Sequence, residues 1–168
     1  MQRRRFLQLG LGAAAALAVA GGGFALLQPG LQEGRLTEAG RAVFSAVARA
    51  VLDGSLPADD ASRTQAMRAH LNRLDDTLSA FPQGTQSELS QLLALLAAAP
   101  GRLALTGLAA TWEAATVPQI QQALQGMRIS SLGLKQQAYH ALRDLTNAAY
   151  YADPSTWPLL GYPGPRVQ

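Results

Sequence analysis

The side chains that could perform acid–base or metal chemistry in this sequence are few and far apart. The two histidines, His70 and His140, fall on separate predicted helices, and neither has a second histidine at the spacing of a metal site. His140 and Asp144 are four residues apart on one helix face, but two ligands do not complete a zinc site, which needs three or four. We interpret this pair as a surface hydrogen bond.

Two pairs of adjacent acidic residues, Asp59–Asp60 and Asp75–Asp76, would suit general acid–base catalysis only if both carboxylates faced one substrate. Neighbouring residues on a helix point about 100° apart, so neither pair converges on one point. We interpret them as a solvated face and as partners of a helix dipole. The serines lack the Gly-x-Ser-x-Gly and Ser-x-x-Lys settings of activated nucleophiles. The sequence therefore predicts no catalytic constellation, and we expect that the chain is not an enzyme.

The chain has no cysteine, which excludes several classes of redox protein. Covalent haem attachment needs Cys-x-x-Cys-His, iron–sulfur clusters usually need four thiolates, and a lipoprotein needs a cysteine to acylate. Disulfide bonds are excluded as well, so packing alone must hold the domain together. We expect no cofactor on this chain.

The net charge of +3 comes from the first five residues. Three of the fourteen basic residues are Arg3, Arg4 and Arg5, and the remaining eleven balance the eleven acidic residues, which all follow them. Nucleic-acid binding requires a basic patch on the folded domain. A formally neutral body argues against a nucleic-acid partner.

The N-terminus has the order of parts that an export signal has: arginines, then an uncharged apolar segment. It resembles a twin-arginine translocation signal, in which Arg3 and Arg4 form the pair and Phe6 and Leu7 follow it. An arginine-rich Sec signal is the alternative. We expect residues 1–27 to be a twin-arginine signal or an N-terminal membrane anchor, with the twin-arginine translocase as a partner.

Residues 6–27 leave the fate of this leader open. As a helix they would reach about 33 Å, enough to cross a hydrocarbon core. They are only moderately apolar and are interrupted by Gly21–Gly23, while Ala18–Ala20 offers a cleavage site. Cleavage there would leave the apolar residues Phe24–Leu27 at the mature N-terminus. We therefore expect a periplasmic protein, which an uncleaved leader would anchor to the inner membrane.

The body of the chain reads as one small all-α domain. Residues 28–36 contain proline and glycine without an apolar period and predict a linker. Over residues 37–152 apolar residues recur at helical spacing, and no window alternates as a strand would. Thr37, Thr85 and Thr116 are predicted to cap helices, the last two in capping boxes. The pattern predicts a single bundle of about five to six helices, at about 38–53, 58–80, 85–100, 102–113, 116–127 and 131–151.

The C-terminus has an unusual composition. Residues 150–165 contain three of the four tyrosines, one of the two tryptophans and four of the nine prolines. Proline fixes φ and removes a backbone donor, which predicts an extended strap over residues 153–168. Tryptophan and tyrosine suit interfaces, and the strap could pack on its own bundle, with Trp157 as a plug, or face a partner. The partner-binding candidates are Tyr150, Tyr151, Asp153, Pro154, Trp157, Tyr162 and Pro163.

These features together resemble a known family. The chain resembles the small subunit (subunit 3, or gamma) of gluconate 2-dehydrogenase complexes. The resemblance is carried by the leader, the helical body, the Leu36–Thr37 start, Tyr151-x-Asp153-Pro154, Trp157 and residues 161–164. The glycine- and asparagine-rich stretch that often follows Asp-Pro in that family is missing, which indicates a divergent branch.

The resemblance implies a function in a complex. Such subunits accompany a large FAD-dependent oxidoreductase of the glucose-methanol-choline type, often with a cytochrome c subunit, and are not the catalyst. The chain would then be an export escort, a stabiliser and a membrane tether, and FAD would be on the partner. The alternative is a stand-alone periplasmic or membrane-anchored helical binding module without an enzyme partner.

Overall fold

The computed structural model describes residues 28–162, and within them the chain is an all-α bundle with one small hairpin. The expectations for the leader (Arg3, Arg4, Phe6 and Leu7, and the anchor over residues 6–27) and for residues 163–168 lie outside this range. The elements are β1 (Leu31–Gln32), β2 (Arg35–Leu36), α2 (Glu38–Val51), α3 (Asp60–Ser79), α4 (Gln83–Ala97), α5 (Ala99–Thr106), α6 (Val117–Arg128), α7 (Gly133–Tyr151) and the 3₁₀ helix η2 (Pro154–Leu160).

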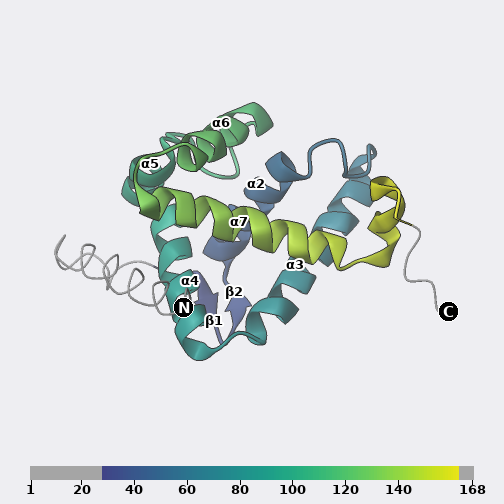
Figure 1. The fold of residues 1–168 in the computed structure, drawn as a ribbon, viewed down its shortest axis with the longest axis horizontal. Coiled ribbons are helices and arrows are strands. Elements are labelled where there is room, and N and C mark those ends of the chain that lie inside the picture. Colours follow the sequence, from purple (N-terminus) through teal and green to yellow (C-terminus); the bar gives the residue numbers. More distant parts are fainter. Residues whose placement is uncertain (1–27, 163–168) are drawn as a thin grey trace.

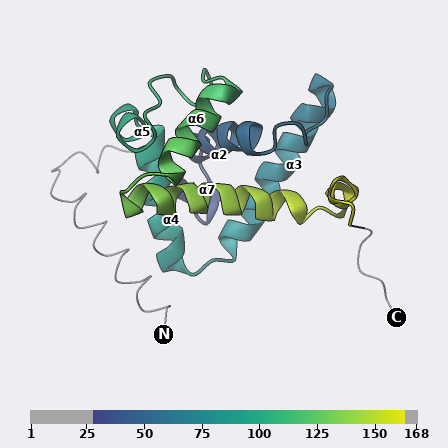
Figure 2. The same ribbon diagram turned by 45° about the horizontal axis from the view of Figure 1, so that its top comes forward.

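Helix α2 is the centre of the bundle. It packs against α3, α4, α6 and α7; α7 crosses in front of it in Figure 1 and lies beside it in Figure 2. Val43, Phe44 and Val47 of α2 are fully buried. Burial of a side chain of this size stabilises a fold by about 1.5–3 kcal/mol. The buried face of α2 is therefore a main source of the domain's stability.

Most helix ends agree with the sequence prediction. Thr37 caps α2 by accepting a hydrogen bond from Gly40 N (3.3 Å), and Thr116 N donates to Gln119 Oε1 (2.9 Å) at the start of α6. The capping box predicted at Thr85 is wrong. Helix α4 begins earlier, at Gln83, with Pro82 as the residue before its first turn, so Thr85 is already inside the helix.

Residues 28–36 are part of the domain and do not form the predicted linker. The strands β1 and β2 pair antiparallel, and their turn uses positive φ angles at Glu33 (52°) and Gly34 (75°). Leu31 and Leu36 are only 7% and 6% exposed and join the core. Two-residue strands are too short to show alternation, which is why the sequence pattern missed the hairpin.

The fourth predicted helix is also different. Helix α5 covers Ala99–Thr106 and ends where Gly107 adopts a left-handed conformation (φ 74°). The prediction extended this helix to residue 113, but the chain after Gly107 is a loop. This loop buries Trp112, whose Nε1 donates a hydrogen bond to Leu96 O (2.7 Å). Trp112 is therefore a core residue that is contributed by a loop.

Asp75 is a buried residue, which contradicts its interpretation as part of a solvated pair. It is 3% exposed, forms an ion pair with Arg41 and accepts a hydrogen bond from Leu36 N (2.8 Å). Its neighbour Asp76 is exposed, as expected. Asp75 thus joins α3 to both the hairpin and α2.

Within residues 28–162, no single helix has the length and hydropathy of a membrane span. The pair α4 and α5 would have them together, but the two helices are bent by 95° where they meet.

Candidate partner-binding site

The predicted extended strap is helical over Pro154–Leu160, so the prediction is wrong for these residues. Proline fixes φ near −65°, a value that a 3₁₀ turn shares with extended backbone. Pro154 occupies the first turn, where its missing N–H has no consequence. Asp153 caps this turn, because its Oδ1 accepts a hydrogen bond from Ser155 N (2.9 Å). We call residues 153–162 the C-terminal knob.

The knob is attached to the bundle through α3 and α7. Arg73 of α3 donates from Nε to Ala149 O (2.8 Å) and from Nη1 to Asp153 Oδ2 (3.0 Å). Thr156 is 7% exposed, and its hydroxyl donates to Asp153 O (2.8 Å). Hydrogen bonds from Ser155, and then the Arg73 guanidinium, lower the pKa of Asp153 below its ordinary value. The start of the knob is therefore held as a charged, hydrogen-bonded joint.

The outer part of the knob presents two aromatic rings. Trp157 and Tyr162 have ring centroids 5.4 Å apart, tilted by 56°, and Tyr162 is 48% exposed. Gly161 adopts a left-handed conformation (φ 67°), which reverses the chain so that Tyr162 N donates to Trp157 O (3.2 Å). Trp157 Nε1 donates to Tyr151 O (2.9 Å), which fixes the indole.

The two rings form the walls of a small hollow of about 240 Å³. Its lining among the described residues is Pro154, Trp157, Pro158, Gly161 and Tyr162, none of which is charged. Rigid aromatic and proline walls lose little conformational entropy on binding and favour an apolar contact. Its described lining is mainly aromatic and proline side chains, a composition that suits an apolar contact.

The structure sorts the predicted site residues into two groups. Pro154, Trp157 and Tyr162 share the hollow. Tyr150 is buried, its hydroxyl donates to Ser55 O (2.6 Å) and burial raises its pKa, so it belongs to the core. Asp153 is used within the knob as a cap, Tyr151 is half-buried and its carbonyl accepts a hydrogen bond from Trp157 Nε1, and Pro163 lies outside the described residues.

Pro158 and Gly161 line the hollow but were not among the predicted site residues. The signal for Gly161 was present in the sequence, because a glycine between Trp157 and Tyr162 permits the chain reversal that brings the two rings together.

The two histidines do not form a site. His70 is fully buried on α3, and burial, followed by the nearby Arg73 charge, lowers its pKa to about 4. His140 is exposed, and Asp144, its predicted partner, instead forms an ion pair with Arg143 (3.1 Å). In the described part of the chain, no three His, Asp or Glu side chains are placed to hold a metal ion.

Comparison of the chain with models of protein families, with curated proteins and with solved structures finds no match. The likeness to the gluconate 2-dehydrogenase small subunit therefore depends only on the sequence features given above, and the function it implies is a proposal.

Proposed function

We propose that this chain is a non-catalytic accessory subunit, of the gluconate 2-dehydrogenase subunit 3 type, in a periplasmic FAD-dependent dehydrogenase complex. It binds the large flavoprotein, accompanies it through the twin-arginine translocase and stabilises it in the periplasm. A leader that stays in place would also tether the complex to the inner membrane. The observation on which the proposal rests is the pair of rings on a fixed knob, in which Trp157 is half-buried and Tyr162 is 48% exposed.

The knob has the properties of a preformed docking surface. Its joint is fixed by Arg73 and Asp153, and the indole of Trp157 is fixed by its hydrogen bond to Tyr151 O. A surface that is ordered before binding loses less entropy on association than a flexible one. Tryptophan and tyrosine are also the side chains most often responsible for binding energy at protein interfaces. These features support a partner at the knob.

The leader supports the escort role. Twin-arginine export moves folded proteins, commonly because a cofactor is inserted in the cytoplasm. This sequence predicts no cofactor site of its own, so the folded, cofactor-containing cargo would be a bound partner without a leader. The contact between the two proteins must then form before export.

Purification of the full chain from its native host tests the proposal. We expect a protein with FAD fluorescence to co-purify, and Trp157→Ala or Tyr162→Ala to reduce its amount at least about tenfold, as expected of central interface aromatics. The melting temperature of the chain should fall by no more than about 4 °C. Ile129→Ala is the matched control, because Ile129 is 68% exposed on another part of the molecule and should leave co-purification unchanged.

Two outcomes would count against the proposal. A loss of thermal stability without a loss of flavoprotein would mean that the aromatic pair serves only the chain's own folding. A co-purified protein without flavin would favour the stand-alone binding module.

A further inference from the structure

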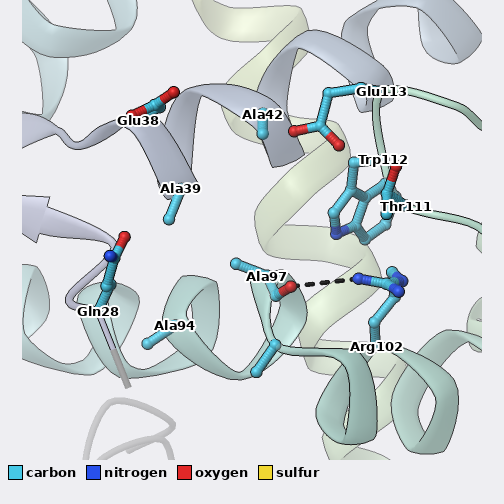
Figure 3. A pocket seen from close by; sticks show the side chains of 11 residues that line it. Gln28, Glu38, Ala39, Ala42, Ala94, Ala97, Arg102, Thr111, Trp112 and Glu113 are labelled. Atoms are coloured by element: carbon cyan, nitrogen blue, oxygen red, sulfur yellow. Dashed lines mark hydrogen bonds between the residues drawn. The ribbon is translucent and has the colours of Figure 1, made fainter. Parts of the chain in front are cut away.

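A second cavity, of about 430 Å³, lies where the described chain begins (Figure 3). Its walls are α2, α4 and the loop after α5, and five of its lining residues are alanines: Ala39, Ala42, Ala94, Ala97 and Ala98. Ala39 of α2 and Ala94 of α4 lie on opposite sides of this space (Figure 3). The cavity is within the size range of ligand pockets, roughly 300–1,000 Å³. We call it the alanine groove.

The charges around the alanine groove argue against an anionic ligand. Arg102 is 6% exposed, and its guanidinium donates to three carbonyl oxygens: Ala97 O (3.2 Å), Leu108 O (3.3 Å) and Ala109 O (3.4 Å). Three of its five N–H donors are therefore already used by neutral acceptors within the fold. Glu38 and Glu113 add two exposed carboxylates to the lining. An apolar occupant, or one with a positive end, fits this lining best.

The chain enters the domain beside this groove, and its point of entry is fixed. Gln28 is itself a lining residue. Next to it, Pro29 O accepts a hydrogen bond from the Thr37 hydroxyl (2.7 Å), and Gly30 N donates to Ser90 O (3.2 Å). Gly30 lies so close to α4 that an added Cβ would be 2.2 Å from the Leu93 Cβ. Gln28, the first described residue, is therefore held in the lining of the groove.

We propose that the alanine groove binds Phe24–Leu27, the apolar end of the leader. These four residues directly precede Gln28, and three of them have large apolar side chains that alanine walls can accommodate. Cleavage after Ala20 would also create an ammonium group at Gly21, whose charge is complementary to Glu38 and Glu113. The groove thus covers the apolar residues that this cleavage leaves on the mature N-terminus.

This assignment has a consequence for the membrane anchor. If Phe24–Leu27 occupy the groove, only residues 6–23 remain to cross a bilayer, and these end in three glycines. A span needs about 20 predominantly apolar residues. Docking of Phe24–Leu27 therefore favours the cleaved leader over the anchor.

Cysteine cross-linking tests the proposal directly, because the chain has no cysteine of its own. A disulfide forms readily only when the two Cα atoms come within about 7 Å. In the purified full chain, Leu26→Cys with Ala97→Cys should form an intrachain disulfide at least tenfold faster than Leu26→Cys with Gln91→Cys. Gln91 is an exposed residue of α4 that does not line the groove. The control pair therefore has its second cysteine on the same helix, separated from residue 26 by a similar length of chain.

Equal rates for the two pairs would overturn the proposal. A disulfide between two chains would overturn it as well, since the occupant would then be a second copy. As a measurement without cysteine, Leu26→Ser with Leu27→Ser should lower the melting temperature of the full chain by several degrees, whereas Leu7→Ser should not. An unchanged melting temperature in the double variant would also contradict it.

Discussion

Arg73 and Asp153 form an ion pair that joins α3 to the C-terminal knob across 80 positions of sequence, with 3.0 Å between Nη1 and Oδ2. The two side chains are 27% and 29% exposed, so solvent screens the pair only partly. In a double-mutant cycle with Arg73→Met and Asp153→Asn, we expect a coupling free energy of about 1 kcal/mol. Urea unfolding of the four proteins measures it.

In that cycle, Arg73→Met should lower the free energy of unfolding more than Asp153→Asn does, because Arg73 additionally donates a hydrogen bond to Ala149 O. A coupling free energy near zero would show that the pair does not hold the knob, and would weaken the case for a preformed docking surface.

Asp75 should be among the most sensitive polar residues of the domain. Asp75→Ala leaves Leu36 N without its acceptor and Arg41 without its partner, which should lower the free energy of unfolding by about 3 kcal/mol. Asp75→Asn keeps an acceptor oxygen and should cost less. The adjacent Asp76→Ala is the matched surface control and should stay within about 0.5 kcal/mol of the parent. Equal effects at both positions would contradict the buried role of Asp75.

His70 should make the stability of the domain depend on pH. Its pKa is about 4 in the folded protein and 6.5 as the ordinary value. Between these values the unfolded chain binds more protons, so the free energy of unfolding falls as the pH drops from 6.5 to 4, by on the order of 3 kcal/mol. Both ring nitrogens are buried without a hydrogen-bond partner in the described structure, which agrees with a neutral ring.

The pH dependence is measured by urea unfolding at several pH values. His70→Leu should remove most of this slope relative to the parent, while His140→Leu, at the exposed histidine, should retain it. An unchanged slope in His70→Leu would assign the pH dependence to other groups.

Much of the helical architecture could be predicted from the sequence, because it depends on local signals. The apolar period, the Thr37 and Thr116 caps and the charge–dipole preference of Asp59 and Asp60 for a helix N-terminus place the starts of α2, α3 and α6 within one or two residues. The hairpin could not be predicted in this way, since its stability comes from burial of Leu31 and Leu36 against helices that follow much later in the chain.

The site shows the same division. The sequence indicated which aromatic and proline residues are unusual, but it did not determine their conformation. Proline is compatible with both extended and 3₁₀ backbone, and Asp153, which caps the 3₁₀ turn, is itself bound by Arg73, 80 residues away. Asp75 was misread although a signal existed: it lies between Leu71, Leu74 and Leu78 on the apolar stripe of its helix, where a carboxylate must be buried and paired.

The escort role is the central claim, and the location of the flavoprotein tests it most directly. In the native host, Arg3→Lys with Arg4→Lys should retain this chain in the cytoplasm. We predict that the FAD-containing partner is retained with it, so that its periplasmic amount, measured by flavin fluorescence and mass spectrometry, falls at least tenfold. A flavoprotein that still reaches the periplasm at the parental level, while this chain does not, would contradict the account.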